Sequence, residues 1–191
     1  MSSTSLCAVI LAGGRGSRLG GRDKGLLGLD GETLAGRLVQ QLRGQADEIL
    51  INANRNASRY RVWAPVVSDL DPHYRGPLAG MQAALHHSAA EWICTLPCDT
   101  PAIPEDYVAR LLKAAASSTL VLAHDGQSLQ PVHALIHSSL RDSLDDYLAG
   151  GGNKVRAWAQ QAGYTIADFS DQADRFRNAN TPQDIHAMRL K

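Results

Sequence analysis

The sequence predicts a three-layer α/β fold with a mostly parallel central sheet. Short apolar segments typical of strands alternate along the chain with segments that have a helical spacing of apolar residues. Such alternation is typical of a parallel sheet covered by helices. A glycine-rich stretch follows the first apolar segment, where folds of this class often place a ligand-binding loop. The length of 191 residues fits one domain, residues 1–191, better than two.

The first half of the chain supplies three strand segments and two helices. Residues 6–12 read LCAVILA and end at Gly13 and Gly14, which predicts a buried central strand feeding a glycine-rich loop. From Thr33 onward, apolar residues at helical spacing and a stop near Gly44 predict a helix. The next expected elements, in order, are a strand at 48–53, a short apolar stretch at 64–67, a Gly-Pro break at 76–77 and a helix at 78–87.

The second half continues the alternation. Residues 92–96 form an apolar strand closed by the sequence PCDTP at 97–101, and Pro104 is expected to start a helix that runs to about residue 116. The run of three glycines at 150–152 is expected to be a loop between helices. The other expected elements are strands at 119–123, 132–136 and 164–169, and helices at 138–149 and 155–163.

Composition excludes several classes of protein. Lys plus Arg and Asp plus Glu each number 19, so the formal net charge is zero, which argues against sequence-independent nucleic-acid binding. The chain has no apolar segment of the roughly 18 residues that a membrane helix requires. Three cysteines are an odd number and favour a reducing cytoplasm over a disulfide framework. Cys94 and Cys98 are therefore expected to pack in the core, with Cys98 close enough to Asp99 to line a site.

The glycine-rich segment at 11–25 reads LAGGRGSRLGGRDKG, with six glycines and four basic residues. Free backbone amides and nearby cations suit a polyphosphate. Two familiar nucleotide motifs nevertheless fail. The P-loop fails because Lys24 lies between Asp23 and Gly25, and the dinucleotide fingerprint fails because Leu19 occupies its third glycine position. Both a P-loop kinase and a dehydrogenase are therefore disfavoured.

The same segment resembles the signature of nucleotidyltransferases that attach a nucleotide to molybdopterin. The resemblance begins with LAGG at 11–14, followed by Arg18, Gly20, Asp23 and Lys24. Further matches follow in the same order, so that the resemblance covers nearly the whole chain. They are NANR at 52–55, Asp69, GPLAG at 76–80, PCDTP at 97–101 and NANTP at 178–182. The chain is similar to the molybdenum cofactor guanylyltransferases, whose cytidylyltransferase relatives usually read LAAG at the first motif.

The resemblance implies a three-layer, Rossmann-like nucleotidyltransferase fold and a cytoplasmic enzyme. Its implied reaction transfers GMP from Mg·GTP to the terminal phosphate of molybdopterin and releases pyrophosphate. By position, Leu11, Ala12 and Gly13 would contact the base. Gly14 and Asn52 would contact the nucleotide, and Asp69 the guanosine. Lys24 and Arg18 would bind phosphate, and Asp99 would bind Mg²⁺. Transient contact with molybdoenzyme assembly proteins is also implied, with neither nucleic acid nor membrane as a partner.

Each of these residues also has a structural interpretation. Lys24 and Arg18 could be solvated loop charges, and Asp99 could cap the following helix rather than hold the metal. Asn178 and Asn180 would face the same side of an extended segment, where one could ligate the metal or the second substrate. Two basic residues after the triple glycine, Lys154 and Arg156, could receive that substrate or be a solvated helix face.

Two other functions stay open at this point. One is transfer from CTP, or transfer to a sugar phosphate, by a related nucleotidyltransferase. The other is a GTP-binding scaffold that delivers the cofactor without chemistry. The histidines at 86, 87 and 133 are distant in sequence from any cysteine or carboxylate cluster, so they are expected to have surface or packing roles.

Overall fold

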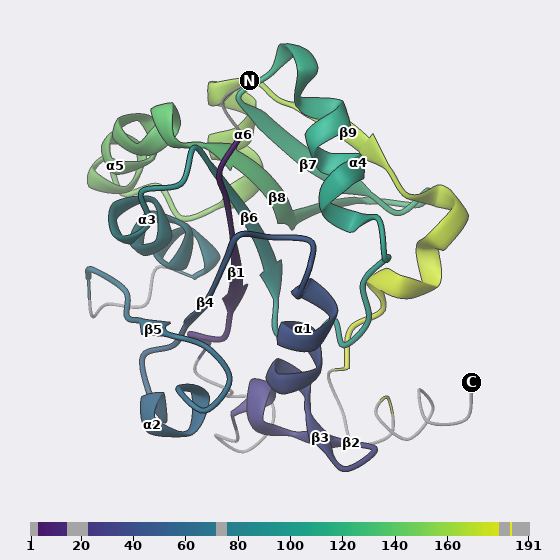
Figure 1. The fold of residues 1–191 in the computed structure, drawn as a ribbon. Coiled ribbons are helices and arrows are strands. Elements are labelled where there is room, and N and C mark those ends of the chain that lie inside the picture. The colour runs from purple at the N-terminus through teal and green to yellow at the C-terminus, as the bar shows by residue number, and fades with distance from the viewer. Residues whose placement is uncertain (1–3, 15–22, 72–75, 180–183, 185–191) are drawn as a thin grey trace.

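The computed structural model describes residues 4–14, 23–71, 76–179 and 184. Figure 1 shows a central twisted sheet with helices on both of its faces. The strands are β1 (Leu6–Leu11), β2 (Gly28–Leu29), β3 (Glu32–Thr33), β4 (Glu48–Asn52), β5 (Val66–Val67), β6 (Trp92–Pro97), β7 (Leu120–His124), β8 (Leu129–His137) and β9 (Thr165–Asp168). The helices are α1 (Leu34–Leu42), α2 (Ala57–Tyr60), α3 (Pro77–His87), α4 (Tyr107–Ala114), α5 (Arg141–Ala149) and α6 (Val155–Ala162), with short 3₁₀ turns at Lys24–Leu26, Ala115–Ser117, Ser138–Leu140 and Ser170–Phe176.

The seven-stranded sheet has the order β5-β4-β1-β6-β8-β7-β9. Strand β1 pairs in parallel with β4 and β6, and β4 pairs in parallel with β5. Strand β8 is antiparallel to both of its neighbours, β6 and β7, whereas β9 is parallel to β7. The sheet is therefore mostly parallel, as the alternation of elements predicted.

Strand β1 contributes to two cores, because successive side chains of a strand point to opposite faces. Ala8 and Ile10 pack in the core that α1 and α4 cover. Val9 and Leu11 pack in the second core, against α3, α5 and α6. All six residues of β1 are buried, which explains why the sequence there is continuously apolar rather than alternating. The three-layer prediction is confirmed.

Most observed element boundaries agree with those expected from the sequence, and helix α1 shows why. Thr33 is its N-cap, and the Thr33 side chain accepts a hydrogen bond from the Gly36 backbone N–H. The triple glycine at 150–152 does lie between two helices, α5 and α6. Strand β8 is longer than expected because its first residues, Leu129 and Gln130, also pair with β7.

The helix expected from Pro104 instead begins at Tyr107, with Asp106 as its N-cap. Two glutamines of the α1 region hold the preceding backbone extended. Gln41 donates to the Pro101 carbonyl and accepts from the Ile103 N–H, each at 2.9 Å. Gln45 donates to the Pro104 carbonyl at 3.3 Å. These contacts satisfy backbone groups that a helix would otherwise satisfy itself.

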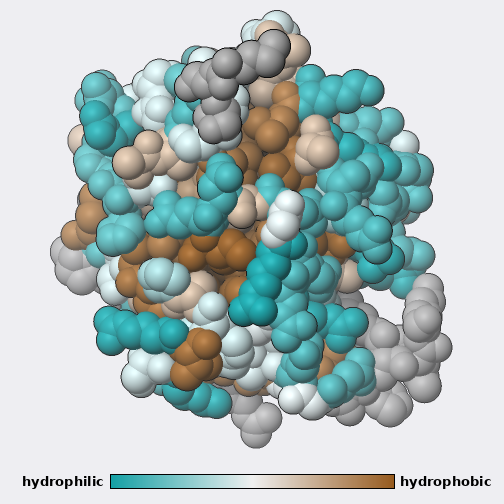
Figure 2. Space-filling view, in the orientation of Figure 1, coloured by the Kyte–Doolittle hydropathy of each residue, from teal (hydrophilic) through white to brown (hydrophobic). Residues whose placement is uncertain are grey.

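The β2–β3 hairpin, helix α2 and the turn at Ser170–Phe176 were not expected. The hairpin has Asp30 and Gly31 at its two central positions, both with positive φ, and Asp-Gly is a strong signal for this turn. Figure 2, in the orientation of Figure 1, shows hydrophilic side chains over the α4 side of the molecule and hydrophobic surface across the middle of this face. In the part of the chain that the structure describes, no helix is long and apolar enough to cross a membrane.

Candidate nucleotide site

The carboxyl ends of three central strands meet at one edge of the sheet. Leu11 pairs with Asn52 of β4 on one side and with Pro97 of β6 on the other. Beyond these pairs, Ala12 N donates to Asn52 O at 2.8 Å and Cys98 N donates to Leu11 O at 3.1 Å. The loops after β1, β4 and β6 are therefore neighbours, and this edge is where parallel α/β sheets bind ligands. In Figure 1 it is the lower end of β1, where the arrowhead lies.

An amide and carboxylate cluster lies beside the first loop. Asn52 is buried, with 2% of its surface exposed, and its Nδ2 donates to Asp69 Oδ1 at 2.8 Å. Asn54 Nδ2 donates to the other carboxylate oxygen of Asp69 at 2.7 Å, and Asn54 Oδ1 accepts from the Asp69 backbone N–H at 2.9 Å. Asp69 is thus fixed by two asparagines of the NANR motif.

Two glycines allow the backbone to approach this cluster. A Cβ atom on Gly13 would lie 3.0 Å from Asn52 Oδ1 and 3.2 Å from Asn54 Nδ2. A Cβ on Gly80, in helix α3, would lie 2.4 Å from Asn52 Oδ1 and 2.7 Å from Leu11 Cδ2. The LAGG and GPLAG motifs therefore meet at the same side chain, Asn52. Glycine is required at both positions because any side chain would displace that amide.

Lys24 and Asp99 form an ion pair on the other side of this edge. Lys24 Nζ lies 2.9 Å from Asp99 Oδ2, and the two side chains are 26% and 15% exposed. Asp99 follows β6, whereas Lys24 begins the short 3₁₀ turn Lys24–Leu26, at the end of the glycine-rich segment. A cation and a carboxylate, both partly open to solvent, are thus paired just beyond the end of β6. The pair is suited to bind phosphates and a hard metal ion.

Asp99 does not cap a helix, because α4 begins at Tyr107 and Asp106 occupies its N-cap position. Its backbone carbonyl instead accepts a hydrogen bond from Ala179 N at 2.7 Å. This contact brings the segment that contains Asn178 to the site, and Thr100 Oγ1 donates to Asn178 Oδ1 at 3.1 Å. The structural alternative for Asp99 is therefore wrong.

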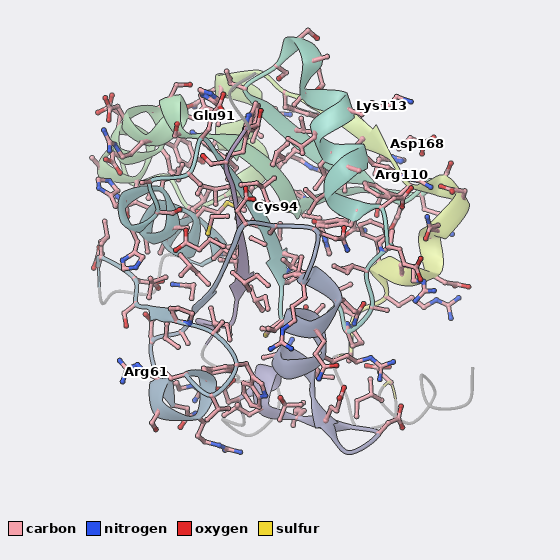
Figure 3. The ribbon with its side chains drawn as sticks, in the orientation of Figure 1. Arg61, Glu91, Cys94, Arg110, Lys113 and Asp168 are labelled. Atoms are coloured by element: carbon pink, nitrogen blue, oxygen red, sulfur yellow. The ribbon has the colours of Figure 1, made fainter. Side chains whose placement is uncertain are left out.

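The cysteines pack in the core as expected. Cys94 and Cys98 are free, buried and part of the α1/α4 core. Figure 3 shows Cys94 in the middle of the sheet. Burial raises the pKa of the Cys94 thiol to about 12 and that of Cys98 still higher, so both stay protonated at neutral pH. Buried, protonated thiols of this kind are typical of cysteines that pack in a core.

His133 is buried rather than exposed, and it lies within a polar chain that leads toward the site. Its Nδ1 lies 3.1 Å from Tyr107 Oη, and its Nε2 lies 3.3 Å from Thr100 Oγ1. Phe176 packs against the ring with a centroid distance of 4.8 Å. Burial lowers the pKa of His133 to about 3, so the ring is neutral. The chain Tyr107–His133–Thr100–Asn178 was not foreseen, because its members are distant in sequence.

Four further expected residues are not among the side chains described at this edge. Lys154 and Arg156 are exposed at the start of α6. Arg18 and Asn180 lie outside the described residues. Within the described ranges, no group of three or more His, Cys, Asp or Glu side chains could hold a metal by itself.

Comparison with known proteins gives concordant results. The family description "MobA-like NTP transferase domain" matches residues 8–164. A molybdenum cofactor guanylyltransferase from Vibrio cholerae is 44% identical over 178 residues, which cover 93% of this chain and 88% of that protein. The molybdopterin-guanine dinucleotide biosynthesis protein A from Archaeoglobus fulgidus has a similar structure, with a TM-score of 0.78, 21% identity and coverage of 97% of each chain. A protein from Mycobacterium tuberculosis H37Rv, solved in complex with manganese, has a TM-score of 0.69 at 15% identity and covers 98% of this chain and 100% of its own.

Proposed function

The chain belongs to the MobA-like NTP transferase family, and on this premise we propose how its residues catalyse guanylyl transfer. The reaction transfers GMP from GTP to the terminal phosphate of molybdopterin, forms the guanine dinucleotide cofactor and releases pyrophosphate. Similarity to relatives named molybdenum cofactor guanylyltransferase carries this assignment. The meeting of the Asn52–Asp69 cluster and the Lys24–Asp99 pair at one sheet edge supports it.

The nucleoside of GTP would bind at the LAGG end of this edge. Leu11, Ala12, Gly13 and Gly14 are assigned to the nucleotide by their position in the motif, and Gly13 lies beside the Asn52–Asp69 cluster. Asn52 and Asp69 hold each other before any ligand arrives, so little reorganisation is needed when the guanosine binds. A nucleoside whose donors and acceptors did not match would leave buried polar groups unpaired, at a cost of roughly 1–3 kcal/mol for each group.

The phosphates of GTP would bind at the Lys24–Asp99 end, together with Arg18. Lys24 Nζ is already directed to the carboxylate that would hold the metal, so it is placed to neutralise phosphate charge next to that metal. We assign Mg²⁺ to Asp99. The donor set fits, because Mg²⁺ is commonly held by one or two carboxylates with water and substrate phosphates as its other ligands. When bound, the metal would neutralise charge on the phosphates.

No general base is required from the protein. The second pKa of a phosphate monoester is about 6, so the attacking oxygen of molybdopterin is already mostly deprotonated at neutral pH. That oxygen forms a bond to the α-phosphorus of GTP as the bond from this phosphorus to the bridging oxygen of pyrophosphate breaks. Lys24 and Arg18 lower the repulsion between the two anions, and the strand-end loops hold them in line.

The second substrate would approach from the side of the carboxyl-terminal segment. Asn178 supports this proposal because it contacts Thr100, next to Asp99. Asn180 is assigned to the same role by position. Lys154 and Arg156 are exposed at the start of α6, and their assignment to the second substrate stays a prediction from the sequence.

Cytoplasmic location and transient contact with molybdoenzyme assembly proteins complete the proposal. Three free cysteines, all buried, are compatible with a reducing compartment. A dinucleotide product must pass from this protein to an apoenzyme, which is the reason to expect a transient partner. Co-purification of an assembly protein only when the product is bound would test this contact.

The deciding experiment is pyrophosphate release measured with GTP, CTP or ATP in the presence of Mg²⁺ and molybdopterin. We expect release that depends on molybdopterin and is far faster with GTP than with the other nucleotides. Equal turnover with CTP would refute the guanylyl assignment. Tight GTP binding without any pyrophosphate release would indicate a delivery scaffold. Thermal unfolding with each nucleotide reports binding separately, because a ligand of the native state raises its stability.

A further inference from the structure

Asp23 precedes Lys24, and its carboxylate has a set of partners of its own. The side chain is 6% exposed. Tyr60 donates its hydroxyl hydrogen to Asp23 Oδ1, and Asn56 Nδ2 donates to Asp23 Oδ2 at 2.9 Å. Arg55 Nε lies 3.9 Å from the same Oδ2. Two hydrogen-bond donors and one guanidinium from the segment 55–60 therefore surround a nearly buried carboxylate.

Gly25, on the other side of Lys24, packs against the same tyrosine. A Cβ atom on Gly25 would lie 2.5 Å from Tyr60 Oη, which is closer than real contacts allow. Tyr60 is fully buried in the core, so its ring provides a fixed surface. Asp23, through its side chain, and Gly25, through its close approach, thus both contact Tyr60 on either side of Lys24. The Asp23 carbonyl also accepts from Leu26 N at 3.2 Å.

Lys24 has a different environment from its two neighbours. Its side chain is 26% exposed and reaches Asp99 Oδ2 at 2.9 Å. A lysine has four rotatable side-chain bonds and loses considerable entropy when it is fixed. Because the Cα of Lys24 is fixed beforehand, only its side chain has to become ordered when an anion binds. A buried carboxylate is costly unless it is fully hydrogen-bonded. The burial of Asp23 at this position therefore needs a reason beyond packing.

We propose that Asp23, held by Tyr60 and Asn56, is a positioning residue that sets Lys24 for the phosphates of the nucleotide. Asp23 touches neither substrate in this proposal and acts only through Lys24. The proposal rests on the proposed function, because that function assigns Lys24 to phosphate. It also explains the order Asp-Lys-Gly in the motif. Asp23 anchors the segment, and Lys24 binds the phosphates. Gly25 leaves room for the ring of Tyr60.

The test is a double-mutant cycle on GTP affinity, measured by titration calorimetry with Mg²⁺ on the full chain. We expect Asp23→Asn to weaken GTP binding about tenfold in the parent and less than about twofold in Lys24→Ala, because a residue that acts through Lys24 has nothing left to position. Tyr60→Phe keeps the ring and removes the hydroxyl, so it should reproduce the same pattern with a smaller effect. Asp47→Asn is the matched control. Asp47 also accepts a hydrogen bond, from Leu6 N at 2.8 Å, but at the amino-terminal end of β1, and GTP affinity should not change.

Equal weakening by Asp23→Asn in both backgrounds would overturn the proposal, since Asp23 would then act independently of Lys24. Unchanged affinity in both Asp23→Asn and Tyr60→Phe would also overturn it. If Asp23→Asn does not fold, Tyr60→Phe alone decides through the same cycle. Failure of the proposed function has a different signature, because the parent itself would then not bind GTP.

Discussion

Gly80 lies inside helix α3, where replacing glycine with alanine normally stabilises a protein. In an exposed helix interior the gain is about 1 kcal/mol. Here the new Cβ would lie 2.4 Å from Asn52 Oδ1 and 2.7 Å from Leu11 Cδ2. Neither atom can withdraw easily, because Asn52 is held by Asp69 and Leu11 is packed in the second core.

The steric cost should exceed the helical gain. Overpacking a buried site costs roughly 1–3 kcal/mol, and displacing Asn52 from its hydrogen bonds adds about 1 kcal/mol. We therefore expect Gly80→Ala to lower the free energy of unfolding by about 1–3 kcal/mol. Because Asn52 is assigned to the nucleotide, we also expect GTP affinity to fall about tenfold, which corresponds to about 1.4 kcal/mol.

Urea unfolding and GTP titration of the same variant test both parts. Gly28→Ala is the control, because its Cβ would meet only Glu32 O at 3.9 Å and its φ is not positive. Its stability should stay within about 0.5 kcal/mol of the parent. If Gly80→Ala instead stabilised the protein by about 1 kcal/mol and bound GTP normally, the close contact at Asn52 would be refuted.

Three further expectations follow from other parts of the structure. Asp99→Ala should lower kcat about a hundredfold or more with little loss of stability in urea, since Asp99 caps no helix. Near-normal turnover with a stability loss of about 1 kcal/mol would contradict the metal role. The pKa of His133 is about 3 in the folded chain and about 6.5 when unfolded. The unfolded chain therefore takes up a proton first, and this residue makes stability fall as pH drops from about 6.5 to 3, by up to about 1.4 kcal/mol per pH unit. His133→Gln should flatten the dependence of unfolding free energy on pH in that window, and an unchanged slope would refute a neutral buried ring. The Cys98 thiol, whose pKa burial raises, should resist iodoacetamide at pH 7.5 in the folded protein and react in urea, whereas rapid alkylation of the folded chain would show that it is accessible.

The surface ion pairs of Arg110 could not be predicted from the sequence. Arg110 binds both carboxylate oxygens of Asp171, at 2.6 and 2.8 Å, and also pairs with Asp106. Figure 3 shows Arg110 on α4 close to Asp168, at the end of β9. The guanidinium lowers the pKa of the Asp171 carboxyl. This network ties α4 to the turn that leads into Asn178, although these residues lie far apart in the sequence.

Local sequence was sufficient for most of the elements. The apolar run of β1, the Thr33 cap and the glycines at 150–152 each act on their nearest neighbours, so their effects can be read directly from the order of residues. The Asp30–Gly31 turn was equally local, but its two-residue strands are too short to give an apolar pattern. The delayed start of α4 depended on Gln41, about sixty residues away.

The sequence by itself determined the fold class, the family to which the motifs belong and the strand ends at which a ligand site is expected. Only the tertiary structure decided how the motifs combine. Asn52 meets Gly80 and Asp69, and Lys24 meets Asp99, 75 positions away. The physical reason is that strand and helix patterns follow from periodic burial along the chain, whereas a polar contact depends on the order and register of strands. That order places β4 and β6 on either side of β1, and local sequence does not specify it.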